Sequence, residues 1–122
     1  MSFFPADQIV YEATEKIYQN EPFLLERFGE KGKEKCREDN HHHLKHLQTA
    51  FDLQNAQVFT DYAIWLNGIL VKHGMKTQHL IDNFDYLKEV LLEMEIQDQE
   101  RVSAYLAYLK AGTDALLKEK EK

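Results

Sequence analysis

The sequence predicts an all-α, globin-like domain of five or six helices, and three observations support the all-α part of this prediction. Apolar residues recur at the three- and four-residue spacing of helices along almost the whole chain. No run of β-branched residues alternates with polar residues, as a half-buried strand would require. The connections between the helical segments are short, so helices that are neighbours in sequence should pack together.

The first helix is expected to begin at Pro5, because proline suits the first helical position. Its inward face carries Ile9, Val10, Ala13 and Ile17. A short helix or turn follows, which Gly29 and Gly32 should end. Its inward-facing residues are expected to be Phe23, Leu24, Leu25 and Phe28. The next helix should extend from about Lys33 to Leu53.

Three residues farther along the chain, Asn55, Thr77 and Asp98, are of types that cap helix N-termini. The helix after Asn55 should end at Gly74, which follows two basic residues. The expected core faces of the three helices comprise Val58, Phe59, Tyr62, Trp65, Leu66, Ile69 and Leu70, then Leu80, Ile81, Phe84, Leu87 and Leu91, then Val102, Tyr105, Leu106, Leu109 and Leu116. We assign residues 1–118 to one domain and residues 119–122 to a charged tail.

Composition narrows the function. A net charge of −6 argues against nucleic acid or an anionic membrane as the main partner, because both require a basic surface. The single cysteine cannot form an internal disulfide, which favours a cytoplasmic location. No apolar stretch approaches the length of a membrane-spanning helix, and the N-terminus lacks the basic start of a secretory signal.

The helix expected from Lys33 to Leu53 has an unusual inward face. Since each residue advances about 100° around a helix, Asp39 and His43 lie within about 60° of Cys36. The same stripe continues through Asn40, Leu44, Leu47, Ala50 and Phe51. It is therefore polar in its first half and apolar in its second. A buried carboxylate is costly unless it is paired, so Asp39 should either reach solvent or meet a dedicated partner.

Three explanations follow from these residues alone. The first two turns of the helix could simply extend into solvent. A metal could bind His42 and His46, or Asp39 and His43, but each pair supplies only two ligands and the pairs face different directions. Cys36 could be a nucleophile, yet the sequence offers no third catalytic group and no oxyanion donor.

A fourth explanation comes from a family resemblance. The pattern C-R-E-D-x4-L-x-x-L-x-x-A starting at Cys36 is followed by VF-x-x-Y-x-x-W-LNG-x-L-x-x-x-G starting at Val58. From about residue 33 to 91 the chain resembles the phycobiliproteins, globin-fold proteins that carry a linear tetrapyrrole. It is most similar to the heme-less globins associated with bilin biosynthesis. The family has arginine where Glu38 stands, and its chromophore-flanking tyrosines correspond to His42 and His43.

The resemblance implies non-catalytic binding of a bilin, either biliverdin or a phycocyanobilin-type pigment, for carriage, sequestration or sensing. Asp39 would accept hydrogen bonds from the pyrrole N–H groups, and Cys36 would lie near ring A without an obligatory covalent bond. The implied binding residues are Cys36, Arg37, Asp39, Asn40, His42, His43, Phe59, Tyr62 and Trp65, with Lys33, Lys35 or Lys45 as further partners of the propionates. The resemblance also suggests bilin-biosynthesis enzymes as partners.

Two alternatives remain open. Heme needs a strong axial ligand, and only His73 and His79 follow the Asn55–Lys72 segment, neither of them well placed. A ligand-free domain could instead act through protein contact alone. In that case a homodimer face could contain Tyr11, Tyr18, Tyr105 and Tyr108.

Overall fold

The computed structural model describes residues 4–121 and contains five helices and no strand in that range. The helices are α1 (Ala6–Asn20), α2 (Phe23–Leu53), α3 (Ala56–Lys72), α4 (Thr77–Glu93) and α5 (Gln99–Lys120). The prediction of an all-α, globin-like domain of five or six helices is confirmed.

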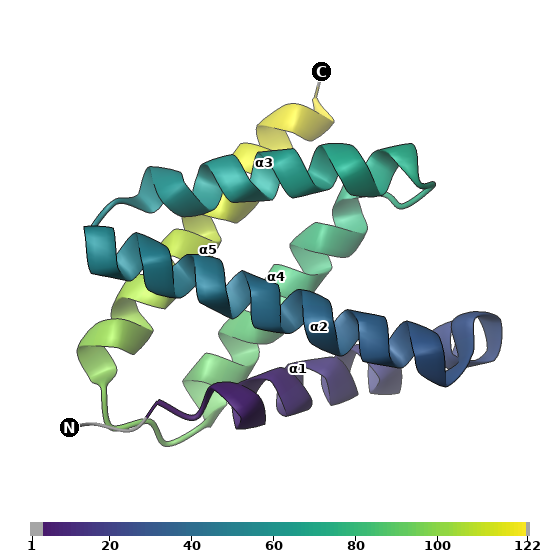
Figure 1. The fold of residues 1–122 in the computed structure, drawn as a ribbon, viewed down its shortest axis with the longest axis horizontal. Helices are drawn as coiled ribbons and strands as arrows, with labels where there is room; N and C mark the ends of the chain where they lie inside the picture. The colour runs from purple at the N-terminus through teal and green to yellow at the C-terminus, as the bar shows by residue number, and fades with distance from the viewer. Residues whose placement is uncertain (1–3, 122) are drawn as a thin grey trace.

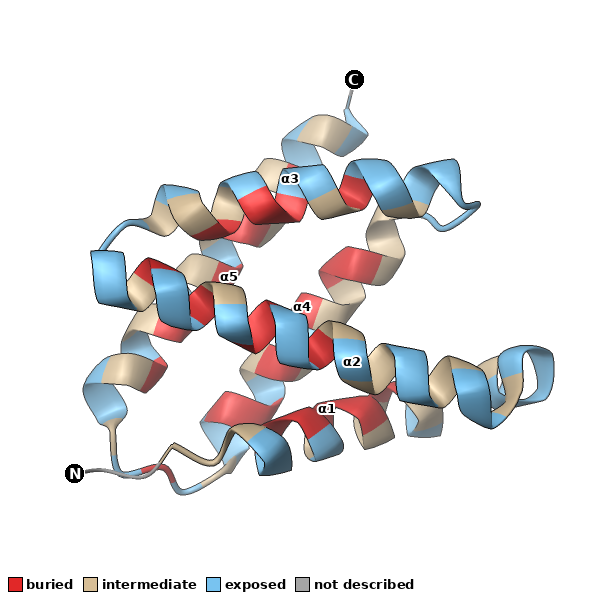
Figure 2. Cartoon of the chain, viewed as in Figure 1, coloured by how far each residue is buried: buried red, intermediate tan, exposed pale blue. Residues whose placement is uncertain are grey.

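The helices form two crossing layers. In the view of Figure 1, α2 and α3 extend across the front, while α4 and α5 cross diagonally behind them. Helix α1 lies beside α2 and also packs on α4, and α3 packs mainly on α5. Figure 2 shows the buried residues on the faces that the helices turn toward one another. One apolar cluster fills this interior, and its largest members include Phe59, Phe84 and Tyr105.

Two of the three predicted N-terminal caps, Asn55 and Asp98, are right. Asn55 accepts a hydrogen bond from the Gln57 amide at 3.0 Å, and Asp98 accepts one from the Arg101 amide at 3.1 Å. Pro5 precedes α1 rather than opening it. The Thr77 prediction is wrong by one residue, because the cap position is Lys76.

At that cap, the amide of Lys76 donates to Nδ1 of His79 at 3.0 Å. His79, three residues into the helix, therefore satisfies the backbone N–H of the cap residue, which is the reciprocal half of a capping box.

The prediction of a helix break is right at Gly29 and wrong at Gly32. Helix α2 continues through Gly32 and is interrupted only by a kink at Gly29, where φ is 67° and ψ is −167°. This conformation is essentially restricted to glycine. Because the kinked end projects beyond the core, the large apolar side chains expected to face inward there are exposed instead; these are Phe23, Leu25 and Phe28.

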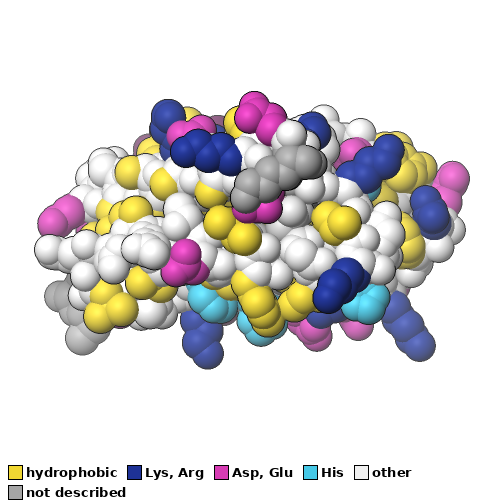
Figure 3. All heavy atoms as spheres, turned by 90° about the horizontal axis from the view of Figure 1, so that it is seen from above, with side chains coloured by type: hydrophobic (Ala, Val, Ile, Leu, Met, Phe, Trp, Pro, Cys, Tyr) yellow, Lys and Arg dark blue, Asp and Glu magenta, His cyan; other side chains and the backbone are white. Residues whose placement is uncertain are grey.

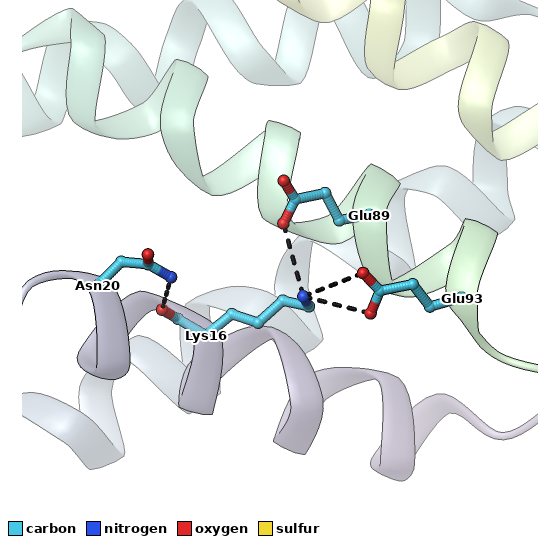
Figure 4. A network of polar contacts seen from close by, with 4 residues as sticks. All are labelled: Lys16, Asn20, Glu89 and Glu93. Atoms are coloured by element: carbon cyan, nitrogen blue, oxygen red, sulfur yellow. Dashed lines mark hydrogen bonds and ion pairs between the residues drawn. The ribbon is translucent and has the colours of Figure 1, made fainter.

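A polar network fixes α1 against α4 at the edge of the bundle (Figure 4). The Nζ atom of Lys16 lies 3.2 Å from Oε2 of Glu93 and 3.6 Å from Oε2 of Glu89. These carboxylates raise the pKa of Lys16, the hydrogen bond with Glu93 contributing most. Both carboxylates are exposed, so the network chiefly sets the alignment of the two helices.

Helix α5 passes very close to α3. A Cβ atom built on Gly112 would lie 2.8 Å from the Phe59 ring, so any side chain at this crossing would have to displace that ring. The predicted core faces of α4 and α5 are confirmed, except that Leu106 is only half-buried. On α3, Trp65 and Ile69 are exposed, contrary to prediction. Helix α5 continues to Lys120, so residues 119 and 120 extend the helix.

Candidate functional site

The central part of α2 carries the polar stripe that the sequence singled out. Asn40 and His43 are buried, while Cys36, Arg37 and Asp39 are half-buried and His42 is exposed. The stripe continues into the core through Leu44 and Leu47, as predicted. Its polar half is thus not a solvated protrusion. It lies where α2 packs against other helices.

Asp39 stands at the edge of this interface. Its side chain is 33% exposed, and the only ion-pair contact found for it among the described residues is Nζ of Lys35 at 3.5 Å. Lys35 itself is largely exposed, so this pair is weak. Burial raises the pKa of Asp39, and the charge of Lys35 opposes that shift only in part. The carboxylate is thus partly desolvated without a strong partner.

Cys36 lies one helical turn from Asp39 and is not a reactive thiol. Burial, with a further contribution from the Asp39 charge, raises its pKa to about 11. The thiolate, which is the nucleophilic form, is therefore scarce at neutral pH. This microenvironment does not support the hypothesis of cysteine catalysis.

A chain of buried and half-buried polar side chains links α2 to α3 and α4. Asn40 Nδ2 donates to the carbonyl oxygen of Cys36 at 3.0 Å, and Asn83 Nδ2 donates to Asn40 Oδ1 at 2.7 Å. Nδ1 of His43 lies 2.6 Å from the hydroxyl oxygen of Tyr62. Burial lowers the pKa of His43 to about 3, so its ring is neutral.

Asn83 is a polar partner of the α2 stripe that the sequence did not predict. It lies directly before the buried Phe84 in a helix read only for its apolar face. Asn83 is a polar residue at the border of an apolar helix face. That position could have indicated a partner for the polar half of α2.

Helix α3 supplies an aromatic wall beside this stripe. Phe59 is part of the core, whereas Tyr62 is 7% exposed and Trp65 is 63% exposed. The ring of His46 stacks on Tyr62 with centroids 3.7 Å apart, and the centroids of Tyr62 and Trp65 are 6.4 Å apart. His46 was considered only as a metal ligand in the sequence, because a stacking partner on another helix leaves no local signature.

We call the surface formed by these residues the Asp39 face. It consists of Lys35, Asp39, His42 and His46 of α2 and Tyr62 and Trp65 of α3. The four α2 residues fall within about 60° of one another around the helix. Figure 3 shows histidine and hydrophobic side chains lying next to one another along one edge of the molecule. The face thus combines one carboxylate, a cation, imidazoles and exposed aromatic area.

The other predicted cations lie elsewhere. Lys33 pairs with Glu15 of α1 at 2.7 Å. Lys45 lies about 120° around α2 from Asp39, where it lines a cavity of about 140 Å³ together with His41 and Arg101. Arg37 is half-buried and lies about 160° around the helix from Asp39. Among the predicted cations, only Lys35 therefore faces the same way as Asp39.

The histidines offer little to a heme iron or a free metal. Nδ1 of His79 accepts a hydrogen bond, which places the ring proton of the neutral tautomer on Nε2, the nitrogen usually bound to iron. His73 is exposed at the end of α3. Within residues 4–121, no three His, Cys, Asp or Glu side chains are grouped as a metal site would require.

No helix in the same range is long and apolar enough to span a membrane.

The fold and the site define a helical, globin-like protein with a half-buried carboxylate and an aromatic wall on one face. Residues 5–112 match the family model described as phycobilisome protein. The match covers most of the chain, so this protein belongs to the phycobilisome protein family. Proteins of this family are non-enzymatic and carry covalently linked linear tetrapyrroles. No curated protein and no solved structure shows significant similarity to the chain.

Proposed function

We propose that this protein binds a linear tetrapyrrole, such as biliverdin, on the Asp39 face and does so without catalysis, for carriage, sequestration or sensing. The observation that carries the proposal is Asp39 itself. It is a partly desolvated carboxylate whose pKa is raised by burial and whose only ion-pair contact in the described chain is an exposed lysine. Such a group gains most from a ligand that presents several N–H donors.

The chemistry of the face fits a bilin in three respects. The carboxylate of Asp39 matches the converging pyrrole N–H groups. The exposed ring of Trp65, next to the stacked Tyr62 and His46, matches a flat conjugated ligand. Lys35, which lies largely in solvent, is free to leave Asp39 and meet a propionate.

We further propose that binding is non-covalent in the absence of an attaching enzyme, although the family carries its pigments covalently. A thioether to Cys36 would need the thiolate, and the pKa of about 11 keeps this form scarce. Glu38 also replaces the arginine that precedes the aspartate in phycobiliproteins. Denaturation in acidic urea followed by zinc-induced fluorescence on a gel tests this: pigment that remains on the chain contradicts it.

The functional test is titration of the purified protein with biliverdin, phycocyanobilin and hemin, followed by absorption spectroscopy. We expect a sharpened, red-shifted long-wavelength band with a bilin. A Soret band with hemin alone would favour the heme-binding alternative. No change with any of the three would favour a domain that acts only through protein contact.

One residue of the predicted homodimer face is buried. Tyr105, assigned to a homodimer face with Tyr11, Tyr18 and Tyr108, is 1% exposed and packs in the core. Tyr105 therefore cannot belong to that face, and a homodimer stays a prediction. A role within a light-harvesting assembly remains a second candidate, which family membership favours. Sedimentation analysis with and without bilin distinguishes a monomeric carrier from an assembling subunit.

A further inference from the structure

The outer side of α3 presents apolar residues to solvent. Trp65 is the most exposed of them at 63%, and the others are Ile64, Ile69 and Val71. Figure 3 looks onto the molecule from the side on which α3 lies in Figure 1, and it shows hydrophobic side chains between acidic and basic ones. An exposed apolar patch with charged residues around it is typical of a contact surface between proteins.

One stripe extends along the middle of this side of α3. It contains Asp61, Trp65, Gly68 and Lys72, which are all exposed and fall within about 60° of one another around the helix. A Cβ atom built on Gly68 would have no other atom within 4 Å, so the surface has a gap at this glycine. The stripe therefore combines a large apolar side chain and a gap, between a negative end and a positive end.

The stripe is complementary to a second copy of itself in antiparallel orientation. A two-fold axis at its middle places Trp65 opposite the partner's Gly68 and Asp61 opposite the partner's Lys72. Each of these contacts occurs twice, because a two-fold contact is reciprocal. In a parallel pair, like charges would instead meet at both ends of the helix. Charge and shape thus favour the same antiparallel arrangement.

The charges at the two ends of the stripe are available for such a contact. In the part of the chain that the structure describes, neither Asp61 nor Lys72 forms an ion pair. On α5, by comparison, Lys110 pairs with Asp114 of the same helix at 3.1 Å. The two charges of α3 are too far apart along the helix for such a pair, but they are opposite in sign and can pair between two chains.

We propose that α3 is a homodimer contact, in which the α3 helices of two copies pack antiparallel with Trp65 over the partner's Gly68. This inference goes beyond bilin binding, and its test needs no ligand. Trp65 also belongs to the Asp39 face, so a bilin that stacks on this ring competes with the partner for it. The contact involves little more than one helix of each copy, so the dimer should be weak and reversible.

The fluorescence of Trp65 reports the contact directly, because it is the only tryptophan of the chain. The ligand-free protein is diluted from millimolar to micromolar concentration, and its emission maximum and sedimentation coefficient are recorded. We expect the emission to shift to longer wavelength as the dimer dissociates, because the indole then becomes exposed to water. A chain that sediments as a monomer at every concentration contradicts the proposal. A dimer that dissociates without an emission shift contradicts it as well.

Exchange of the two charges tests the antiparallel register. Asp61→Lys and Lys72→Asp should each weaken self-association by about three- to thirtyfold, because like charges then meet at both ends. An equimolar mixture of the two variants should associate as the parent does, because opposite charges meet again between the two chains. A folding defect could not be repaired by mixing. Single variants that associate like the parent, or a mixture that does not recover, would overturn the proposal.

Gly68→Leu tests the gap opposite Trp65. The new side chain has free space in the monomer but occupies the position of the partner's indole, so self-association should fall at least about tenfold at unchanged helicity. Ala107→Leu is the matched control, because it adds the same side chain at an exposed position of α5. It should leave self-association unchanged. Parent-like association of Gly68→Leu would show that α3 is not the contact.

Discussion

Replacing Asp39 by asparagine should weaken bilin binding while leaving the fold intact. The change preserves shape but removes the charge, and the new N–H₂ group would face pyrrole N–H groups, donor against donor. Hydrogen bonds to a charged acceptor contribute about 1.5–3 kcal/mol each, so loss of that assistance corresponds to roughly a ten- to hundredfold lower affinity. Lys35 reduces the effect only slightly, because it is exposed and 3.5 Å away.

The spectrum should change with the affinity. A carboxylate favours the fully protonated, cationic bilin, which absorbs furthest to the red. We therefore expect the bound pigment of Asp39→Asn to absorb at shorter wavelength, at unchanged helicity by circular dichroism. Glu38→Gln is the matched control, because Glu38 is the exposed neighbour and its replacement removes the same charge from the same helix. Equal affinity and equal spectra for parent and Asp39→Asn would refute the assignment of the carboxylate to the pyrrole nitrogens.

In the ligand-free protein, Asp39→Asn should leave the stability at pH 7 unchanged or raise it. Because burial raises the pKa of Asp39 in the folded state, the folded chain binds a proton there more readily than the unfolded chain. At pH values above its folded pKa, ionised Asp39 therefore destabilises the folded state. This penalty disappears as pH falls through the folded pKa toward the ordinary value of the carboxyl group. We expect Asp39→Asn to melt at the same or a higher temperature than the parent at pH 7. Relative to the parent it should lose that advantage under acidic conditions, which thermal melts across pH would show.

Three further predictions concern Cys36 and two glycines. With a pKa of about 11, the Cys36 thiol should react with iodoacetamide at pH 8 on the order of a hundredfold more slowly than in the urea-unfolded chain; equal rates would mean that burial does not protect it. Gly29→Ala should destabilise the fold by about 1–3 kcal/mol in denaturant melts, because φ at this kink is 67°. Gly68→Ala, at an open helical position, should be neutral or slightly stabilising, and a similar loss in both would argue against strain at Gly29. Gly112→Ala should cost about 1–3 kcal/mol by forcing the Phe59 ring aside, and a neutral result would show that α3 and α5 can separate freely.

The exposed apolar side chains show where sequence periodicity misleads. Phe23, Leu25 and Phe28 have the spacing of an inward face, but the segment before the Gly29 kink projects past the bundle and meets no second layer. Trp65 has core spacing as well, and its position on α3 places it at the border of the helix pair instead. Periodicity identifies which residues share a face, whereas burial requires that another element covers that face.

The sequence by itself determined the helical class, two of the three predicted N-terminal caps and the inward stripe of α2, because helix periodicity and capping are local properties. The sequence also singled out Asp39, because the spacing within one helix is enough to show that this carboxylate lies on a stripe leading into the core. The tertiary structure decided what surrounds that stripe. His43 meets Tyr62 from α3, and Asn40 meets Asn83 from α4, over sequence separations of 19 and 43 residues. Such pairings depend on how the helices cross, and no spacing within one helix encodes them.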